Sequence, residues 1–152
     1  MTDSKPAFIS FRERPEPAPG ARVRVYRNLN RPTLFSVVAL SGDHKGKVMG
    51  YAAVVGLANV SLKVSERQRQ GVLVKQVRTV HAFAEGTLVE MTSELPESCK
   101  RQSSKVVTYQ PFLAGFFFDR AAPDIPIRNL ATAWSAGANL VVPGEEMKER
   151  HA

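Results

Sequence analysis

Short segments in which apolar and polar residues strictly alternate are the feature that most constrains how this chain folds. In residues 22–27, Val23 and Val25 fall on one side, and two arginines and a tyrosine fall on the other. Residues 59–64 alternate in the same way. A period of two residues is typical of a strand with one buried and one exposed face. Such strands predict an antiparallel sheet that covers a core on one side.

Turn-forming residues separate these segments from further apolar runs. Residues 28–32 and 41–46 are rich in asparagine, proline, glycine and serine, and they predict turns. Residues 121–127 contain Pro123 and Pro126 and are predicted to be irregular, because proline lacks an N–H donor and has a fixed φ. The remaining expected strands span residues 33–40, 47–55, 79–89, 105–119 and 139–142, with a polar loop at 91–104.

The alternation of apolar and polar residues ends at Ser65, which lies three residues before Gln68. This spacing predicts a capping box, in which the serine hydroxyl accepts from a backbone N–H and the glutamine side chain reaches back. The predicted helix spans residues 66–77. Its expected apolar face consists of Leu73, Val74 and Val77. We therefore predict an α+β fold, a largely antiparallel sheet of about five to seven strands with one short helix packed on it.

The length and composition predict one domain with flanking segments. The chain has 152 residues, of which 43% are hydrophobic and 23% charged, so it can bury a single core. Residues 1–20 hold four prolines and are predicted to form an extended arm, with Phe8 and Phe11 available to anchor it. Residues 21–143 are predicted to form the α+β domain, and residues 144–152 a charged tail.

Several classes of protein are excluded by simple counts. No apolar run approaches the ~20 residues that span a membrane, and the first 20 residues lack the apolar segment of a secretory signal. The single cysteine, Cys99, excludes an internal disulfide and fits a reducing compartment. Its two basic neighbours favour a thiolate, but no histidine partner is identifiable, so a simple loop thiol is the preferred interpretation. We expect a cytoplasmic protein without a membrane partner.

The whole chain has a net charge of +7, and its positive charge is concentrated in the first half. Residues 1–80 hold 14 lysines and arginines against 5 acidic residues, whereas residues 81–152 hold 7 against 9. Such asymmetry predicts a surface that faces a polyanion, where an aromatic ring among cations can stack on a base. Two ordinary solvated faces are the other interpretation. The predicted nucleic-acid-binding residues are Arg22, Arg24, Tyr26, Arg67, Lys75 and Arg78.

An aromatic run in the second half predicts either core packing or a contact surface. The three consecutive rings of Phe116–Phe118 cannot all point to one side of a strand, so at least one of them is expected at the surface. Core packing is the simpler interpretation. The other is contact with a partner protein or self-association through this region.

Candidate catalytic residues are few. His81 and Glu85 lie four residues apart on an expected strand, so they share a face on which acid–base chemistry or metal binding is feasible. A third ligand has to come from Asp43, His44 or Asp119, and a strand histidine with a backbone partner is the simpler interpretation. The common catalytic and phosphate-loop motifs do not occur. We predict a non-enzyme without cofactor or metal, with a metal-dependent hydrolase as a third option.

Four blocks of the sequence form a recognisable pattern. They are Tyr26-Arg27-Asn28-Leu29; Lys63-Val64-Ser65-Glu66 with Arg69-Gln70 and Val72-Leu73; Val80-His81-Ala82-Phe83 with Gly86 and Leu88; and Val107-Thr108-Tyr109 with Pro111-Phe112. This pattern resembles a family of small uncharacterised proteins carried by phages and plasmids. The resemblance implies a mobile-element origin and transfers no functional residue. Gly71 stands where the family pattern has a basic residue, which argues against a basic contact centred on the helix.

Charge and resemblance together predict a phage or plasmid accessory protein that binds nucleic acid, DNA or RNA, mainly through its backbone. The alternative is a protein–protein interaction module that inhibits or adapts a host or plasmid machine. Salt dependence separates the two, because phosphate contacts weaken steeply as the salt concentration rises.

Overall fold

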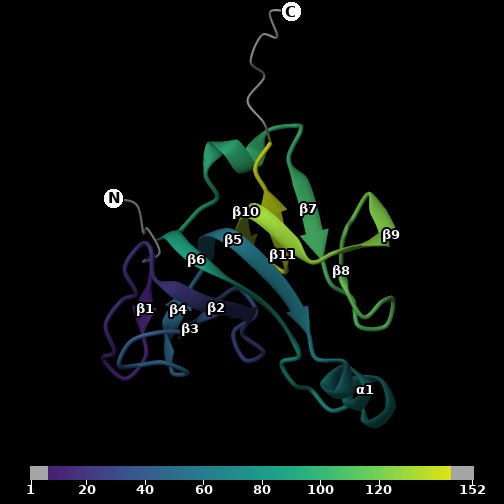
Figure 1. Cartoon of the computed structure of the whole chain (residues 1–152), viewed down its shortest axis with the longest axis horizontal. Coiled ribbons are helices and arrows are strands. Elements are labelled where there is room, and N and C mark those ends of the chain that lie inside the picture. Colours follow the sequence, from purple (N-terminus) through teal and green to yellow (C-terminus); the bar gives the residue numbers. More distant parts are fainter. Residues whose placement is uncertain (1–6, 145–152) are drawn as a thin grey trace, which may run out of the picture.

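A computed structural model describes residues 7–144 of the chain. Within them, eleven strands form one antiparallel sheet in the order β1-β4-β3-β2-β6-β5-β10-β11-β7-β8-β9, and one α-helix projects from the sheet (Figure 1). The strands are β1 (Ile9–Ser10), β2 (Arg22–Arg27), β3 (Phe35–Ala39), β4 (Val48–Ala52), β5 (Val54–Val64), β6 (Ala82–Thr92), β7 (Lys105–Thr108), β8 (Phe117–Asp119), β9 (Ala122–Ile127), β10 (Asn129–Ala136) and β11 (Asn139–Val142). The helices are α1 (Glu66–Lys75) and the 3-10 helix η1 (Glu97–Lys100).

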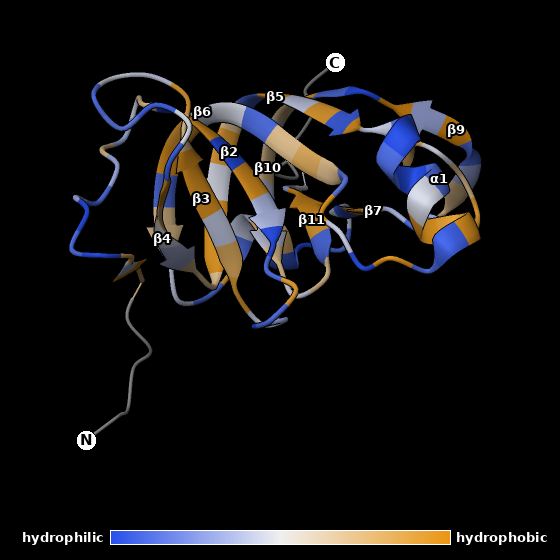
Figure 2. Cartoon of the chain, turned by 90° about the horizontal axis from the view of Figure 1, so that it is seen from below, coloured by the Kyte–Doolittle hydropathy of each residue, from blue (hydrophilic) through white to orange (hydrophobic). Residues whose placement is uncertain are grey.

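The predicted α+β class and the predicted number of strands are wrong, because the described chain is predominantly β-sheet. The helix has ten residues and none of them is buried. Val74, expected on a packed face, is 75% exposed. The apolar residues of α1 are the consecutive Val72, Leu73 and Val74, which spread around a helix instead of forming one stripe. Figure 2 shows the resulting mixture of hydrophilic and hydrophobic segments on α1.

The strand predicted over residues 22–27 is confirmed. β2 covers these residues, with Val23 and Val25 fully buried. It pairs with β3 on one side, and β3 pairs with β4, so these three strands form an antiparallel meander. On its other side β2 pairs with β6, where Arg24 lies opposite Glu85.

The sheet curls around its main core. Side chains of β2 and β3 pack in the same cluster as side chains of β7, β8 and β11, which lie on the other side of β5 in the strand order. Phe35 and Val25 represent the first group, and Val107, Phe117 and Leu140 the second. The two parts of the sheet therefore face each other across the interior, and a cavity of about 300 Å³ lies between them.

Besides β1, two strands in the second half of the chain lie where none was predicted. Residues 121–127, expected to be irregular, contain β9, the last strand in the sheet order. An edge strand tolerates Pro123 and Pro126 because one of its sides needs no N–H donor. β10 pairs along most of β5. Its sequence, NLATAWSA, is rich in small residues, so its alternation gives little signal.

β5 is continuous through Gly56, which lies between the predicted strands 47–55 and 59–64. Trp134 of β10 lies opposite Gly56 and covers it. A Cβ at this position would lie 2.5 Å from a ring carbon of the indole. Gly56 therefore serves a close cross-strand contact within a strand and does not mark a turn.

The predicted start of the helix is confirmed. The Ser65 hydroxyl accepts a hydrogen bond from the Gln68 backbone N–H at 3.4 Å. The Ser65 backbone N–H donates to the carbonyl of His81, the residue before β6, at 2.7 Å, so this carbonyl replaces the acceptor that was expected from the Gln68 side chain. The helix ends at Lys75, two residues before the predicted end, because Gln76 adopts a left-handed conformation with φ of 54°.

The part of the predicted arm that the structure describes lies against the edge of the sheet. β1 pairs with β4, and the Phe11 backbone N–H donates to the Met49 carbonyl at 2.9 Å. The Phe8 ring packs on Gly50, and the Phe11 ring makes an edge contact with Tyr51. Residues 1–6 and 145–152, which include most of the predicted tail, lie outside the described residues. The division into arm, domain and tail stays a prediction.

No helix in the described part of the chain is long and apolar enough to cross a membrane.

Candidate functional site

Three of the six predicted nucleic-acid-binding residues lie on one face of one strand. Arg22, Arg24 and Tyr26 project from β2 on the side opposite Val23 and Val25, which are in the core. Arg22 is exposed, and the other two are half-buried. The register of β2, β6 and β5 places further side chains on the same surface. Together these side chains form a surface that we call the outer face, which consists of Arg22, Arg24, Tyr26, Lys63, Phe83 and Glu85.

Glu85 holds two cations of the outer face in place. Its carboxylate accepts from Nε of Arg24 at 2.7 Å and pairs with Arg24 Nη2 at 2.6 Å and Lys63 Nζ at 2.8 Å. Burial acts to raise the pKa of the Glu85 carboxyl, but the hydrogen bonds and charges of Lys63 and Arg24 outweigh it and hold the pKa below its ordinary value of 4.5. Glu85 is therefore ionised at neutral pH.

Aromatic rings lie among these cations. The Arg24 guanidinium lies 4.3 Å from the centre of the Phe83 ring, a cation–π geometry. Phe83 is in register with Lys63 on β5, and Tyr26 lies two residues beyond Arg24 on β2. Lys63 and Phe83 were not among the predicted site residues. The alternation of residues 59–64 signals an outward Lys63, whereas the only signal for Phe83 is its spacing of two residues from Glu85.

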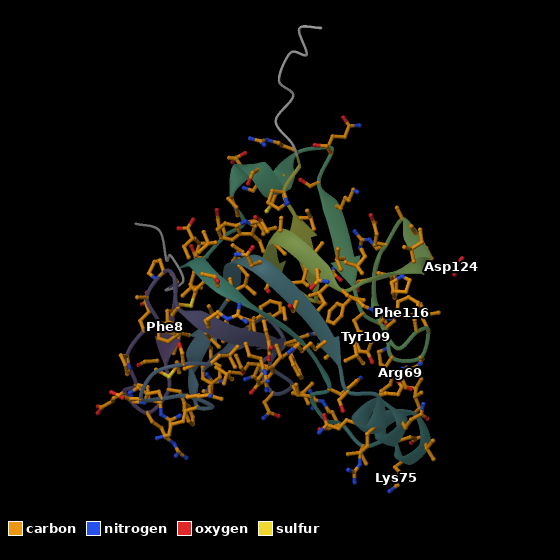
Figure 3. All side chains as sticks on the ribbon, viewed as in Figure 1. Phe8, Arg69, Lys75, Tyr109, Phe116 and Asp124 are labelled. Atoms are coloured by element: carbon orange, nitrogen blue, oxygen red, sulfur yellow. The ribbon has the colours of Figure 1, made fainter. Side chains whose placement is uncertain are left out.

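The other three predicted residues do not lie on the outer face. Arg67 and Lys75 are exposed on α1, beyond the end of β5. One contact docks the helix on the rest of the protein, and Lys75 lies at the opposite end of the helix from it (Figure 3). That contact is made by Arg69, whose Nε donates to the Pro111 carbonyl at 2.9 Å. Arg78 follows the helix and donates to the carbonyl of Leu29, just after β2.

The candidate catalytic residues have different contacts. The Glu85 oxygens bind two cations, whereas Nδ1 of the buried His81 lies 3.0 Å from the Thr79 carbonyl. Among residues 7–144, no group of three or more histidine, cysteine or acidic side chains is arranged to hold a metal ion. Cys99 is buried, and burial raises the pKa of its thiol, so the basic neighbours do not produce a thiolate.

The aromatic run divides between core and surface. Phe117 and Phe118 are buried, and Phe116 is half-buried with its ring 6.4 Å from that of Phe118. The most exposed apolar side chains near this run belong to the preceding loop, where Phe112 is 73% and Leu113 72% exposed. Contact with a partner through Phe116–Phe118 stays a prediction.

The outer face combines the groups that recognise phosphate and bases. Its three cations outnumber its one carboxylate, so it retains a net positive charge. Its two aromatic rings offer flat surfaces next to the cations. A polyanion with planar rings is the kind of ligand that such a surface can bind without catalytic chemistry.

Comparison with known proteins agrees with the phage resemblance. A family model described as the Mycobacterium phage L5 gene 82 protein matches residues 16–132, which include the outer face, α1 and most of the strands. No curated protein and no solved structure matches the chain. The chain belongs to the family of the Mycobacterium phage L5 gene 82 protein.

Proposed function

We propose that this member of a phage protein family is a mobile-element accessory protein that binds nucleic acid through its outer face, mainly at the phosphate backbone. The observation that carries the proposal is the placement of cations and rings on three neighbouring strands. Arg22 and Arg24 come from β2, Lys63 from β5 and Phe83 from β6. Cations release condensed counterions when they neutralise phosphates, and rings stack on bases of any sequence.

Glu85 positions Arg24 on the outer face and also adds a negative charge there. A guanidinium has five N–H donors, and Glu85 engages Nε and Nη2 of Arg24, so donors remain for a phosphate oxygen. Fixing the side chain in advance also reduces the entropy that is lost on binding. The cost is one negative charge near the ligand, which lowers affinity.

Binding as a function of salt tests the proposal. The full chain is titrated into fluorescently labelled single strands and duplexes of DNA and RNA at several salt concentrations. We expect log K to fall linearly with log salt, by ~0.9 per phosphate contact on a duplex and ~0.7 on a single strand. Arg22→Ala with Lys63→Ala should weaken binding to all sequences alike and flatten the slope by about two contacts. Tyr26→Ala should weaken single-strand binding by ~1–3 kcal/mol through lost stacking.

Two matched double variants locate the contact. Lys105→Ala with Arg120→Ala removes the same charge from exposed positions of β7 and the turn after β8, and should leave the slope unchanged. Arg67→Ala with Lys75→Ala shows whether α1 contributes further phosphate contacts. Absence of binding to either nucleic acid at low salt refutes the proposal.

A protein–protein interaction module is the second candidate function. Phe112 and Leu113 are adjacent and largely exposed on the loop between β7 and β8, near the half-buried Phe116. An apolar interface centred on this loop predicts binding to a protein partner that changes little with salt and is lost in Leu113→Asp. Steep salt dependence of the dominant interaction favours the nucleic-acid proposal instead.

A further inference from the structure

The interior cavity between the two parts of the curled sheet has mainly apolar walls. Val25 and Phe35 form one side, and Val107, Phe117 and Leu140 form the other. Its volume of about 300 Å³ is at the lower end of the range for pockets that hold small molecules.

Three residues that line this cavity each carry a buried polar atom without a hydrogen-bond partner. These atoms are Nε2 of His81, the hydroxyl of Tyr109 and Oγ of Ser135. His81 is 8% exposed and Ser135 1%. Four such side-chain atoms occur among the described residues, and three of them belong to residues that line this one cavity. Because a buried polar atom without a partner destabilises the fold, the presence of three such residues around one cavity points to an occupant that forms hydrogen bonds.

The three atoms define what the occupant has to offer. The Thr79 carbonyl can only accept, so Nδ1 of His81 carries the hydrogen of their contact, and in that tautomer Nε2 is an acceptor. Burial raises the pKa of Tyr109 to about 12, so its hydroxyl stays protonated and can donate. The Ser135 hydroxyl can do either. The matching ligand therefore carries an N–H donor and an acceptor on one small body.

The shape and charge of the cavity limit the ligand further. His81, Tyr109 and Phe117 form a chain of rings with centres 5.3 Å apart at each step, which favours a flat aromatic body. Figure 3 shows Tyr109 between the end of β7 and α1 in that view. Arg27 is the one charged side chain among the described lining residues, and it is exposed. A charged group therefore fits only at the mouth, and an acyl chain would leave the three polar atoms unpaired.

We propose that this cavity binds the heterocyclic ring of a nucleoside, supplied either as a free nucleoside or as an unstacked base of a nucleic-acid strand. His81 Nε2 accepts from a ring or exocyclic N–H, the Tyr109 hydroxyl donates to a ring nitrogen or carbonyl, and a phosphate lies outside near Arg27. Tyr26 and Phe83 belong both to the outer face and to the lining of this cavity, but His81, Tyr109 and Ser135 are not part of the outer face, so this site does not require the proposed function.

Ligand-observed NMR of the full chain with each of the four common ribonucleosides at millimolar concentration tests the free-ligand source. Anisotropy with a labelled single strand tests the strand source. Tyr109→Phe and Ser135→Ala each remove one hydroxyl, and each should weaken binding about fivefold or more. The same variants should keep or raise the melting temperature, because they remove an unpaired polar atom. Tyr51→Phe removes a hydroxyl outside the cavity and serves as the control.

Each outcome decides the proposal. Nucleoside binding that depends on Tyr109 supports the free ligand. If no nucleoside binds but single-strand binding depends on Tyr109, the result supports the unstacked base as the ligand. If no nucleoside binds and strand binding is the same in both variants, or if nucleosides bind equally to wild type and both variants, the proposal is wrong. Duplex binding that depends on Arg22 and Lys63 but not on Tyr109 supports the proposed function even if the cavity binds no base. Failure of the cavity proposal can therefore be distinguished from failure of the proposed function.

Discussion

Glu85→Gln should change stability and nucleic-acid binding in opposite directions. The substitution keeps the size of the side chain and removes its charge. Glu85 is 8% exposed and contacts Arg24 and Lys63 at 2.6–2.8 Å, while those cations are 38% and 55% exposed. Hydrogen bonds to charged groups stabilise by roughly 1.5–3 kcal/mol, and solvent-screened ion pairs by at most about 1 kcal/mol. Because one amide oxygen can still accept, we expect a loss of about 2 kcal/mol in the free energy of unfolding.

The same substitution removes the one carboxylate of the outer face. A unit charge ~7 Å from a phosphate in a water-like medium contributes about 0.6 kcal/mol of repulsion. Removing this repulsion should tighten binding two- to threefold at moderate salt, with a larger gain at low salt. The protein then binds more tightly although it is less stable.

Urea unfolding and anisotropy with a labelled single strand measure the two effects on the same preparation. Glu90→Gln, at an exposed position of the same strand, is the matched control and should alter the free energy of unfolding by less than about 0.5 kcal/mol. If Glu85→Gln binds more weakly while it remains folded, the outer face does not contact phosphate in the way we infer. An unchanged free energy of unfolding would show that the Glu85 contacts contribute no net stability.

Three further predictions concern stability. The stability that Glu85 contributes is complete above its ordinary pKa of 4.5 and is lost as the pH falls through its lower folded pKa, so the unfolding free energies of wild type and Glu85→Gln should converge in acid. Ser65→Ala should lower the free energy of unfolding by ~0.5–2 kcal/mol in urea titrations, because the Gln68 N–H loses its acceptor; no change would count against this cap. Deletion of residues 1–19 should lower the melting temperature and keep unfolding cooperative, since it removes β1 and two aromatic contacts but no strand from the middle of the sheet. Phe11→Ala in the full chain should reproduce part of that loss, and an unchanged melting temperature after the deletion would show that the arm does not stabilise the sheet.

Signals confined to a few neighbouring residues predicted local structure well. The alternation of residues 22–27 predicted the strand and both of its faces, because a strand needs no more than period-two placement. Ser65 predicted the start of the helix, because a cap is formed by residues three positions apart. In both cases the atoms that determine the structure lie within one short segment.

Features that depend on distant segments could not be predicted in the same way. The apolar residues of α1 are the consecutive Val72, Leu73 and Val74, which give no amphipathic period. The contact that docks the helix is made by Arg69 with a carbonyl 42 residues away. Two prolines argued against β9, and only its position at the end of the strand order makes them tolerable. The position of a strand in a sheet is a property of the whole chain, so local propensity gave the wrong fold class.

The same distinction applies to the two candidate sites, which share strands. On β2, Arg24 points outward to Glu85, 61 residues away, while Val25 points inward to the cavity. Alternation along β2 predicts that one strand serves two surfaces, but it identifies neither partner. Only the pairing of β2 with β6 brings Glu85 to Arg24, and only the curl of the sheet brings Tyr109 and Ser135 to the cavity that His81 also lines. Sequence therefore predicted the residue types that half of the outer face presents, whereas the cavity exists only in the assembled sheet.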